Sequence, residues 1–340
     1  MRKVGRTDLR LPALVLGAMA RRQSSDKERI KLFEAAIDQG FNAIDTAPLY
    51  GFGRAEQQLG TVLKHVSRNQ VQILTKVGLR WHGEKHGEVL FEFTDGNGRL
   101  RQVRKDSRPE SVRLEVLQSL ERLGVETLDL VQIHHPDLHT PFADTMGTLL
   151  DMRREGKLRH IGVSNFSAEQ VRAAQIALGE VPLCSVQPDY SLVRRRAELE
   201  LLPLCRELDI GVLVFSPLAE GLLAGKKLKV SNPAVQKIEM VIHEVLFPIA
   251  QDHGVSPAAV VLAWVIAQPG VTSAITGAST IEQLNQQTQA TKLQLSKSEI
   301  QLLGTAFSEV QLPYSWEHRE VGLRKIVRRG RAFLGRAARR

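Results

Sequence analysis

Four side chains that could together move a proton follow three short apolar runs of this chain: Asp45 with Tyr50 a few residues on, Lys76 and His134. A free tyrosine has a pKa of about 10, which is too high for easy proton exchange at neutral pH. A neighbouring ammonium would lower that pKa, and a carboxylate behind the ammonium would keep the lysine charged. A histidine across the pocket could donate to the oxygen that the tyrosine protonates. Together the four groups fit proton donation to a carbonyl oxygen during hydride attack.

Each of these residues also has a structural interpretation when it is taken alone. An Asp after a strand often caps a helix, a Tyr usually packs, and a Lys is usually solvated. A His after an apolar run can be a hydrogen-bonded core residue. The chemical interpretation therefore depends on a fold that brings the four together.

Short apolar runs alternate with helical patterns along the chain, and this alternation would position the four side chains. We predict strands at 14–17, 42–45, 72–75, 129–133, 159–163, 184–187, 212–215 and 272–275. Strands separated by helices pair in parallel, and eight such units favour an α/β fold of the closed (β/α)8 TIM barrel type, whose strand C-termini open on one face. An open doubly wound sheet shares the local pattern, but no GxGxxG follows the early strands, which weakens that alternative.

Helical spacing of apolar residues fills the intervals between these strands. Residues 109–123 open with Pro109 and stop at Gly124, which is the usual asymmetry of helix ends. Further helices are predicted at 26–39, 54–67, 142–155, 167–178, 197–208, 235–252, 256–267 and 280–291. We expect a barrel domain over 1–312, with an N-terminal β-hairpin and extra C-terminal helices, and a basic tail over 313–340.

Two segments allow alternative interpretations. The basic start of the chain, its apolar run and Ala18-Met19-Ala20 mimic a signal peptide, but "KVGRTDLRLP" and "ALVLG" fit a hairpin and a first strand better. Residues 79–106 lengthen the loop after the third strand. We expect a lid that shapes the substrate pocket, the alternative being a solvated excursion with a small hairpin at 95–98.

Composition limits the class of protein. The chain has 340 residues, 43% of them hydrophobic, which suffices for one barrel core, and its longest apolar run (258–267) is too short to cross a bilayer. Cys184 and Cys205 show no metal-ligand spacing, so we expect two buried thiols in a reducing, cytoplasmic setting.

The positive charge is concentrated at the end of the chain. The formal net charge is +9, and residues 316–340 carry nine Lys/Arg and two Glu, which leaves +2 for residues 1–315. We therefore expect no nucleic-acid partner for the main domain. Residues 321–338 have an amphipathic helical pattern that could lie on an anionic membrane surface. We prefer a helix packed under the barrel or an unstructured end, because no lipidation motif supports anchoring.

Several longer segments resemble the aldo-keto reductase family. They are "GFNAIDTAPLYGFGRAEQQLG", "ILTKVG", "SLERLGVETLDLVQIHHPD", "GKLRHIGVSNFS", "VQPDYSL", "VFSPLAEGLLAGK" and "AITGASTIEQL", in the family's order. The resemblance implies that Asp45, Tyr50, Lys76 and His134 are a catalytic tetrad with Tyr50 as proton donor. It implies an NAD(P)H-dependent oxidoreductase acting on a small-molecule aldehyde or ketone. An NAD-dependent sugar dehydrogenase and a slowly turning over regulatory subunit, as in potassium-channel β subunits, are the alternatives.

The resemblance also implies a dinucleotide extended across the barrel mouth. Ser164, Asn165 and Gln187 match positions that bind the nicotinamide carboxamide, and Phe215 matches an aromatic that stacks on its ring. The loop over the pyrophosphate matches Ser216, Pro217, Leu218, Ala219 and Glu220, with Lys226 as counter-charge. The adenosine-phosphate site matches Gly277, Ser279, Gln283 and Gln287. Ala18, Met19 and Asp45 complete the implied set of cofactor contacts.

Some of these residues have plain structural alternatives. Ser164, Asn165 and Ser167 are all good helix caps, and Ser279 with Glu282 could form a capping box. The segment "HHPDLH" superficially suggests a metal site, but we expect adjacent histidines at a strand end to point opposite ways, so we predict no metal. We expect His135 to form a pocket wall or to support its neighbours.

The form of the cofactor and the substrate are less clear from the sequence. We expect NADP(H) to be preferred, with NAD(H) as the alternative, although no Arg or Lys lies between Ala274 and Gln289 to bind a 2′-phosphate. Lys226, Lys227 or Lys229 could supply that charge from the facing loop. We expect the pocket to be shaped by Trp81, His82, Phe91, Phe93, Tyr190 and the run Arg194–Arg196, although such a run can also be a solvated helix entry.

Overall fold

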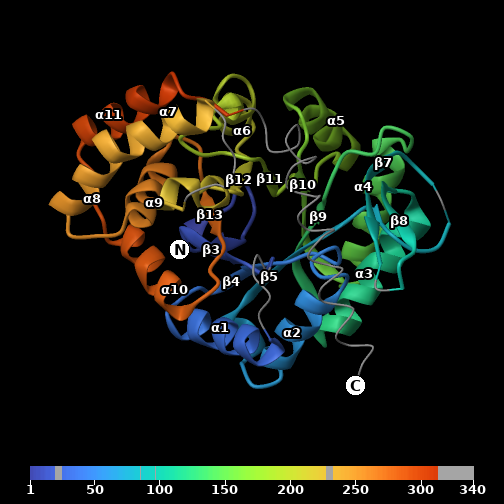
Figure 1. Cartoon of the computed structure of the whole chain (residues 1–340). Coiled ribbons are helices and arrows are strands. Elements are labelled where there is room, and N and C mark those ends of the chain that lie inside the picture. The colour runs from blue at the N-terminus through green and yellow to red at the C-terminus, as the bar shows by residue number, and fades with distance from the viewer. Residues whose placement is uncertain (20–24, 85, 96, 227–232, 313–340) are drawn as a thin grey trace.

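Eight parallel strands close into a barrel in the computed structural model, which describes residues 1–19, 25–84, 86–95, 97–226 and 233–312 (Figure 1). The strands are β3 (Leu14–Gly17), β4 (Ala43–Asp45), β5 (Gln72–Val77), β9 (Leu128–Ile133), β10 (Leu158–Ser164), β11 (Ser185–Gln187), β12 (Gly211–Val214) and β13 (Ser273–Thr276). They pair in the order β10-β11-β12-β13-β3-β4-β5-β9, and β9 pairs with β10. Each overlaps a predicted strand, so the barrel prediction is confirmed.

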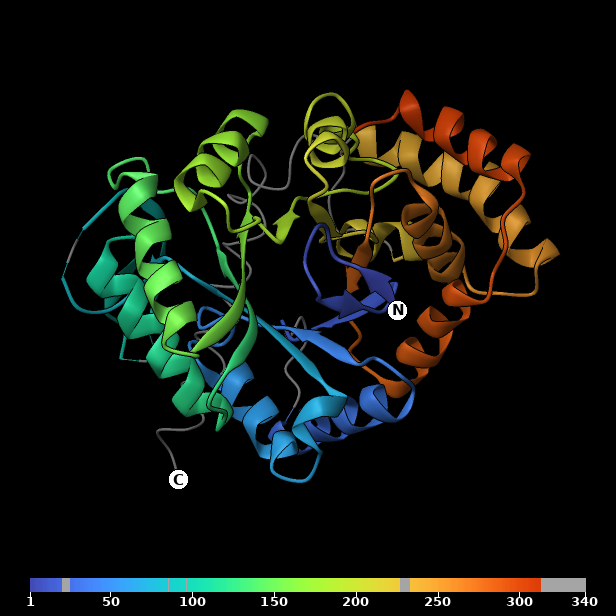
Figure 2. The same ribbon diagram turned by 180° about the vertical axis from the view of Figure 1, so that it is seen from behind.

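Helices surround the strands on the outside of the barrel (Figures 1 and 2). They are α1 (Asp26–Asp38), α2 (Arg54–Leu63), α3 (Pro109–Leu123), α4 (Phe142–Arg154), α5 (Ala168–Leu178), α6 (Leu201–Glu207), α7 (Pro233–Val241), α8 (Phe247–Asp252), α9 (Pro257–Ala267), α10 (Ile281–Thr288) and α11 (Lys297–Ser308). Short helical turns add η1 (Arg68–Gln70), η2 (Arg196–Glu198), η3 (Ala219–Ala224), η4 (Ile242–Leu246) and η5 (Gln289–Thr291). Extra C-terminal helices were predicted after the barrel, and α11 is such a helix within the described residues.

Two predicted helices are interrupted, each near a proline. The range 235–252 contains a π turn, η4, between α7 and α8, and Pro248 follows that turn. The range 197–208 divides into η2 and the shorter α6, where Pro203 lies in the first turn. Proline has no N–H to bond to the preceding turn, which explains why a regular α-helix does not continue through either point.

The amino-terminal hairpin closes one end of the barrel. Strands β1 (Arg2–Lys3) and β2 (Arg10–Leu11) pair antiparallel. Val4, Leu9 and Leu11 pack with the inward residues of the barrel strands, among them Val15 and Leu74. The preferred interpretation of the first twenty residues as a hairpin and first strand is therefore confirmed for those described.

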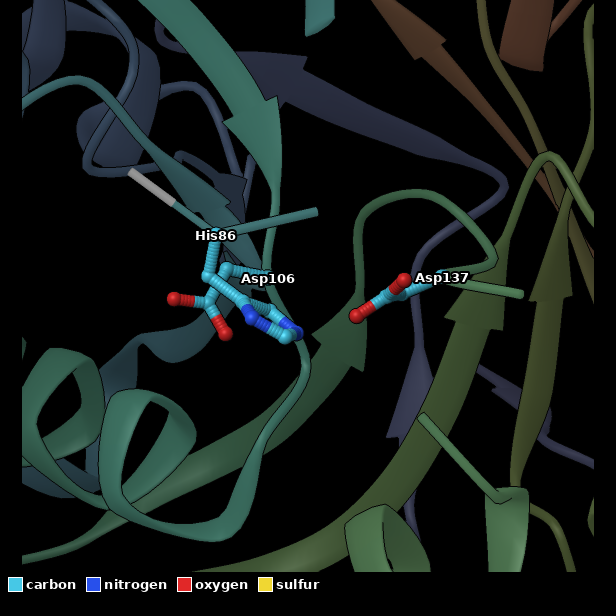
Figure 3. Close-up of side chains that lie close together, drawn as sticks. All are labelled: His86, Asp106 and Asp137. Carbon is cyan, nitrogen blue, oxygen red and sulfur yellow. The ribbon is translucent and has the colours of Figure 1, made fainter. Parts of the chain in front are cut away.

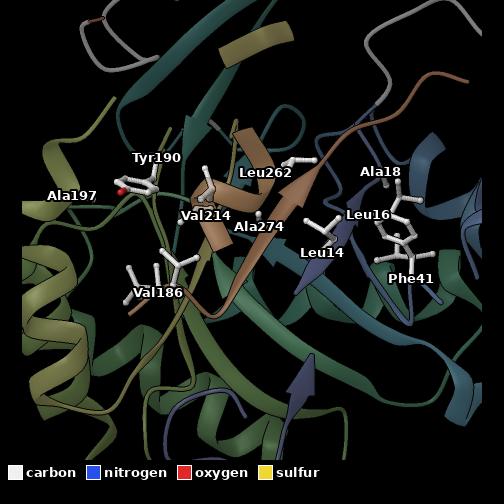
Figure 4. Packing of buried hydrophobic residues seen from close by; sticks show 14 of the residues in the cluster. Leu14, Leu16, Ala18, Phe41, Val186, Tyr190, Ala197, Val214, Leu262 and Ala274 are labelled. Carbon is white, nitrogen blue, oxygen red and sulfur yellow. The ribbon is translucent and has the colours of Figure 1, made fainter. Parts of the chain in front are cut away.

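The larger part of the core lies between the strands and the surrounding helices. Figure 4 shows this packing, with Leu16 and Phe41 near β3, and Val214 and Leu262 near β12 and α9. Cys184 and Cys205 are free thiols and both are buried, as predicted. None of the described helices is by itself long and apolar enough to cross a membrane, although α7–α8 and α9, bent by 91°, pass that test as a pair.

The long insertion after β5 forms a small antiparallel sheet. Strands β6 (Leu79–Arg80), β7 (Val89–Thr94) and β8 (Leu100–Lys105) pair in the order β6-β8-β7. The carboxylate of Asp95 accepts from the N–H groups of Asn97 and Arg99, which closes the predicted hairpin turn. The insertion is therefore an ordered sheet, which we call the lid sheet (79–105).

Candidate active site

The four candidate proton-transfer groups converge at the carboxyl ends of three neighbouring barrel strands. Asp45 ends β4, Lys76 lies in β5, and His134 directly follows β9. The Lys76 Nζ donates to Asp45 Oδ2 at 2.5 Å, to the Thr46 carbonyl at 3.1 Å and to Tyr50 Oη at 3.2 Å. The structure thus brings together the cation, the carboxylate and the phenol that the sequence predicts.

Burial makes the charge of Lys76 depend on its neighbours. Lys76 is 1% exposed and Asp45 is 2% exposed. Burial alone would lower the pKa of Lys76, but the Asp45 carboxylate and the Tyr50 oxygen outweigh that effect, so the pKa of Lys76 is raised. The lysine therefore stays an ammonium at neutral pH and can stabilise negative charge on the phenolic oxygen.

The histidine faces the tyrosine from the other side of the site. The ring centroids of His134 and Tyr50 are 6.0 Å apart at an angle of 84°. His134 is 9% exposed. A carbonyl oxygen within reach of the polar atoms of both rings would meet two groups that are able to donate a hydrogen bond.

Two glutamines behind the site hold the carboxylate in place. Gln187 Nε2 donates to Asp45 Oδ1 at 2.9 Å and to Gln132 Oε1 at 3.2 Å. Asp45 therefore lies between the Lys76 ammonium and the Gln187 amide. Sequence reasoning assigned Gln187 only to the carboxamide and missed Gln132, which lies within the quoted segment "SLERLGVETLDLVQIHHPD" one residue before the end of its apolar run.

The carboxyl end of β10 presents a free acceptor. Asn165 has a positive φ of 65°, and its Nδ2 lies within hydrogen-bond distance of the His134 carbonyl, His135 Nε2 and Ser164 Oγ. Ser164 Oγ donates to the Gln187 carbonyl at 2.9 Å. The buried Asn165 Oδ1 has no hydrogen-bond partner among the residues that the structure describes. Ser167, rather than Ser164 or Asn165, caps α5 through a capping box with Gln170.

The loop after β12 has an unusual backbone. Ser216, Ala219 and Glu220 all have positive φ values of 45° to 59°, and each such residue costs on the order of 1 kcal/mol. Phe215 and Leu218 are half-buried, and Pro217 is buried. Lys226 is exposed at the end of this loop, whereas Lys227 and Lys229 lie outside the described residues.

An ion pair fastens this loop to the loop after β11. Arg194 donates to Glu220 at 2.7 Å and lies 3.6 Å from Asp189, and the Arg194 side chain is only 6% exposed. The interpretation of the arginine run as a solvated entry is therefore wrong for Arg194. Tyr190 is also not a pocket wall, because it is fully buried, stacks on Trp264 and donates to Glu198.

The carboxyl end of β13 carries the residues expected at the adenosine end. Gln287 is buried, and its Nε2 donates to the carbonyl of the exposed Gly277 at 3.1 Å. Within the described part of the chain, its Oε1 has no partner. Gln283 is exposed and accepts from the Ser279 N–H at 2.8 Å. The alternative that Ser279 and Glu282 form a capping box is wrong, since Thr280 is the N-cap of α10 and accepts from the Gln283 N–H. The cap lies one residue later because Thr280 has the extended backbone that a cap requires.

The first strand reaches the same rim. The Ala18 N–H donates to the Asp45 carbonyl at 2.7 Å, which ties β3 to β4 beside the ion pair. Met19 is 41% exposed. These two residues therefore lie at the β3 side of the rim, and their contact with a cofactor stays a prediction.

The lid sheet contacts the loop that carries Tyr50. Phe52 stacks on Phe93 with ring centroids 4.5 Å apart, and lies 5.4 Å from Trp81. Phe52 is 44% exposed. Sequence reasoning named the two lid aromatics and missed Phe52, although it lies two residues after Tyr50. An aromatic wall therefore connects the lid sheet to the site.

A cluster of titratable groups joins the lid sheet to the barrel rim. His86, Asp106 and Asp137 place possible metal-ligand atoms within 4.8 Å of one another (Figure 3). Asp106 already accepts from Arg108, and Asp137 accepts from the Ser107 and His139 N–H groups and from Thr140. We therefore interpret the cluster as a polar anchor of the lid sheet.

The two adjacent histidines do not point opposite ways. The ring centroids of His134 and His135 are 5.4 Å apart at 30°, so the expectation of opposed rings is wrong. Both residues lie in a bend beyond β9, where strand alternation no longer applies. His135 is buried against Asn165, consistent with its expected supporting position.

This constellation can be compared with known proteins. A model described as "Aldo/keto reductase family" matches residues 13–306. The chain belongs to the aldo/keto reductase family. The NADH-specific methylglyoxal reductase of Escherichia coli (strain K12) is 33% identical to this aldo/keto reductase over 327 residues, covering 89% of this chain and 97% of that protein.

Further relatives agree with this assignment. The uncharacterized oxidoreductase YrpG of Bacillus subtilis (strain 168) is 32% identical and covers 92% of this chain and 98% of that protein. The structure of the glycerol dehydrogenase AKR11B4 from Gluconobacter oxydans matches with a TM-score of 0.78 at 30% identity, covering 91% of this chain and 95% of that one. The aldo/keto reductase described here is therefore an oxidoreductase of a family that uses nicotinamide cofactors and acts on small-molecule carbonyl compounds.

Proposed function

We propose that this protein reduces the carbonyl group of an aldehyde or ketone, with Tyr50 as the proton donor and NADPH as the preferred reductant. The observation that carries the proposal is the Lys76 ammonium, which donates to both Asp45 Oδ2 and Tyr50 Oη at the barrel mouth. A nicotinamide dinucleotide, when bound, supplies the hydride that the carbonyl carbon accepts.

The residues of the chain provide the proton and orient the carbonyl oxygen. Tyr50 gives its phenolic proton to the oxygen as the carbon accepts the hydride, so an alcohol and a tyrosinate result. The hydrogen bond from Lys76 strengthens as the phenol loses its proton, because the acceptor becomes charged. His134 donates to the same oxygen from the facing side, and Asp45 keeps the ammonium in place. Proton donation of this kind supplies about 10²–10⁴-fold in rate.

Two orphaned buried acceptors support a nicotinamide dinucleotide across the mouth. Asn165 Oδ1 and Gln287 Oε1 lack partners in the described ranges of the chain, and each suits an N–H donor. The carboxamide of the nicotinamide and the amino group of the adenine are such donors. Ser164, Gln187 and Phe215 would surround the nicotinamide, and Ser216 to Glu220 with Lys226 would cover the pyrophosphate. Ala18 and Met19 would border it, and Gly277, Ser279 and Gln283 would meet the adenosine ribose.

The names of two similar proteins indicate an alternative cofactor and an alternative reaction. One relative is a methylglyoxal reductase specific for NADH, so NADH is the alternative reductant. A related structure is a glycerol dehydrogenase, which favours polyol oxidation as the second candidate function. We propose small aldehydes such as methylglyoxal as first substrates, because the site is bordered by the compact aromatic wall of Phe52, Trp81 and Phe93.

One experiment tests the function directly. Purified protein is assayed with methylglyoxal, a panel of larger aldehydes, glycerol and aldoses, in both directions and with both cofactors. We expect aldehyde reduction with a higher kcat/KM for NADPH than for NADH. A higher kcat/KM for NADH would refute the cofactor preference. Turnover confined to oxidation would favour the polyol dehydrogenase.

A further inference from the structure

A buried guanidinium lies between the two loops that border the adenosine end of the mouth. Arg29 belongs to α1 and is 3% exposed. Its Nη2 donates to the Ala18 carbonyl at 2.8 Å and its Nη1 to the Ala278 carbonyl at 3.4 Å. Its charged end lies 4.9 Å from the centroid of the Phe33 ring.

This guanidinium has no counter-ion among the described residues. Over residues 1–19, 25–84, 86–95, 97–226 and 233–312, no carboxylate forms an ion pair with Arg29, and its buried Nε has no hydrogen-bond partner. Burial lowers the pKa of Arg29 to about 10, so the group is still charged at neutral pH. A buried charge supported only by two carbonyls and an aromatic face is costly, and an anion nearby would stabilise it.

The surroundings of Arg29 identify where such an anion would lie. Ala278, which Arg29 contacts, sits between Gly277 and Ser279, and α10 begins three residues later at Ile281. The N-terminus of a helix favours anions through its free N–H groups and its dipole. The loop itself supplies no cation, since no Lys or Arg lies between Ala274 and Gln289.

We propose that Arg29 is the specificity-determining cation for the 2′-phosphate of NADPH, acting from beneath the 277–280 loop. The charge takes the place of a cationic side chain on the loop, and it also holds the Ala18 and Ala278 carbonyls in fixed positions. The inference rests on the proposed function, because it requires the dinucleotide to lie across this mouth with its adenosine end at α10.

Binding measurements test the inference without any turnover. Dissociation constants of NADPH, NADH, 2′,5′-ADP and 5′-AMP are measured for the full chain by calorimetry or protein fluorescence. The variants are Arg29→Met, which removes the charge, and Arg29→Lys, which retains it. Arg2→Met is the matched control, because Arg2 is a half-buried arginine whose side-chain hydrogen bonds to the described residues go to carbonyls, those of Ile266, Val271 and Thr272. Those carbonyls lie near the start of β13, at the opposite end of the barrel.

We expect Arg29→Met to weaken the binding of NADPH and of 2′,5′-ADP by about tenfold, which is the scale of a charge interaction at a partly buried helix terminus. The dissociation constants of NADH and 5′-AMP should change by less than about twofold, because neither ligand carries the 2′-phosphate. Arg29→Lys should retain most of the selectivity, and Arg2→Met should leave all four constants unchanged.

If Arg29→Met lost affinity equally for all four ligands, or lost affinity for none of them, the proposed role of Arg29 would be overturned. A wild-type protein that binds 2′,5′-ADP no better than 5′-AMP would overturn it too, even if Arg29→Met does not fold. A wild-type protein that binds neither dinucleotide would instead refute the proposed function itself, so the two failures are distinguishable.

Discussion

The buried ion pair of Lys76 and Asp45 gives a prediction that separates folding from chemistry. Substituting Lys76→Met removes the ammonium and leaves the Asp45 carboxylate, which is 2% exposed, with Gln187 as its remaining side-chain donor among the described residues. Breaking one side of a buried pair typically destabilises a protein by about 3–5 kcal/mol. The same change removes the group that stabilises tyrosinate, so kcat/KM should fall by about 10²–10⁴-fold.

The double variant Asp45→Asn with Lys76→Met distinguishes the two effects. Because an uncharged amide needs no counter-ion, we expect the double variant to recover most of the lost stability and none of the lost activity. Stability is measured by guanidinium unfolding, and activity by carbonyl reduction at saturating cofactor. Lys292→Met, at an exposed lysine, is the control for both measurements.

Two outcomes would refute this reasoning. Recovery of activity in the double variant would mean that the lysine acts only by neutralising Asp45. Unchanged stability in Lys76→Met would mean that the pair is not buried as the structure has it.

Two further predictions concern burial and the β12 loop. Burial raises the pKa of Glu115 to about 8 from its ordinary 4.5, so its contribution to stability is complete below about pH 4.5 and is lost as the pH rises through 8. At about 1.4 kcal/mol per pKa unit, the free energy of unfolding of the wild type should fall by about 5 kcal/mol across that window, and Glu115→Gln should abolish this fall. A wild-type pH profile parallel to that of the variant would contradict this. Glu110→Gln, on the same helix at a more exposed glutamate, serves as control. Arg194→Met removes the ion pair that fastens Glu220, so we expect faster cofactor release by stopped-flow fluorescence, about tenfold for one lost charged contact. Release at the wild-type rate would show that the positive-φ backbone holds the loop unaided.

The barrel and the convergence of Asp45, Tyr50, Lys76 and His134 at one rim were predictable from the sequence because each depends on local patterns. Short apolar runs define strands, and the chemistry-bearing residues follow them directly, as Asp45 and His134 do. Parallel pairing then places those residues at one end, so no knowledge of individual contacts is needed.

Other features depend on contacts between distant parts of the chain. Arg29 looks like one of many charges on an amphipathic helix, and only the tertiary structure places it against Ala18 and Ala278. Tyr190 belongs to the motif "VQPDYSL", yet it packs on Trp264 of α9, which no local pattern indicates. The same holds for Phe52, whose partners belong to the lid sheet.

The single-turnover rate of a Tyr50→Phe variant tests the central claim most directly. The substitution keeps the ring that faces His134 and removes only the oxygen that lies 3.2 Å from the Lys76 Nζ. We expect the reduced dinucleotide to bind as in the wild type, and the rate of carbonyl reduction to fall by about 10²-fold or more. Reduction at the wild-type rate by a folded, cofactor-bound Tyr50→Phe protein would contradict the assignment of Tyr50 as the proton donor.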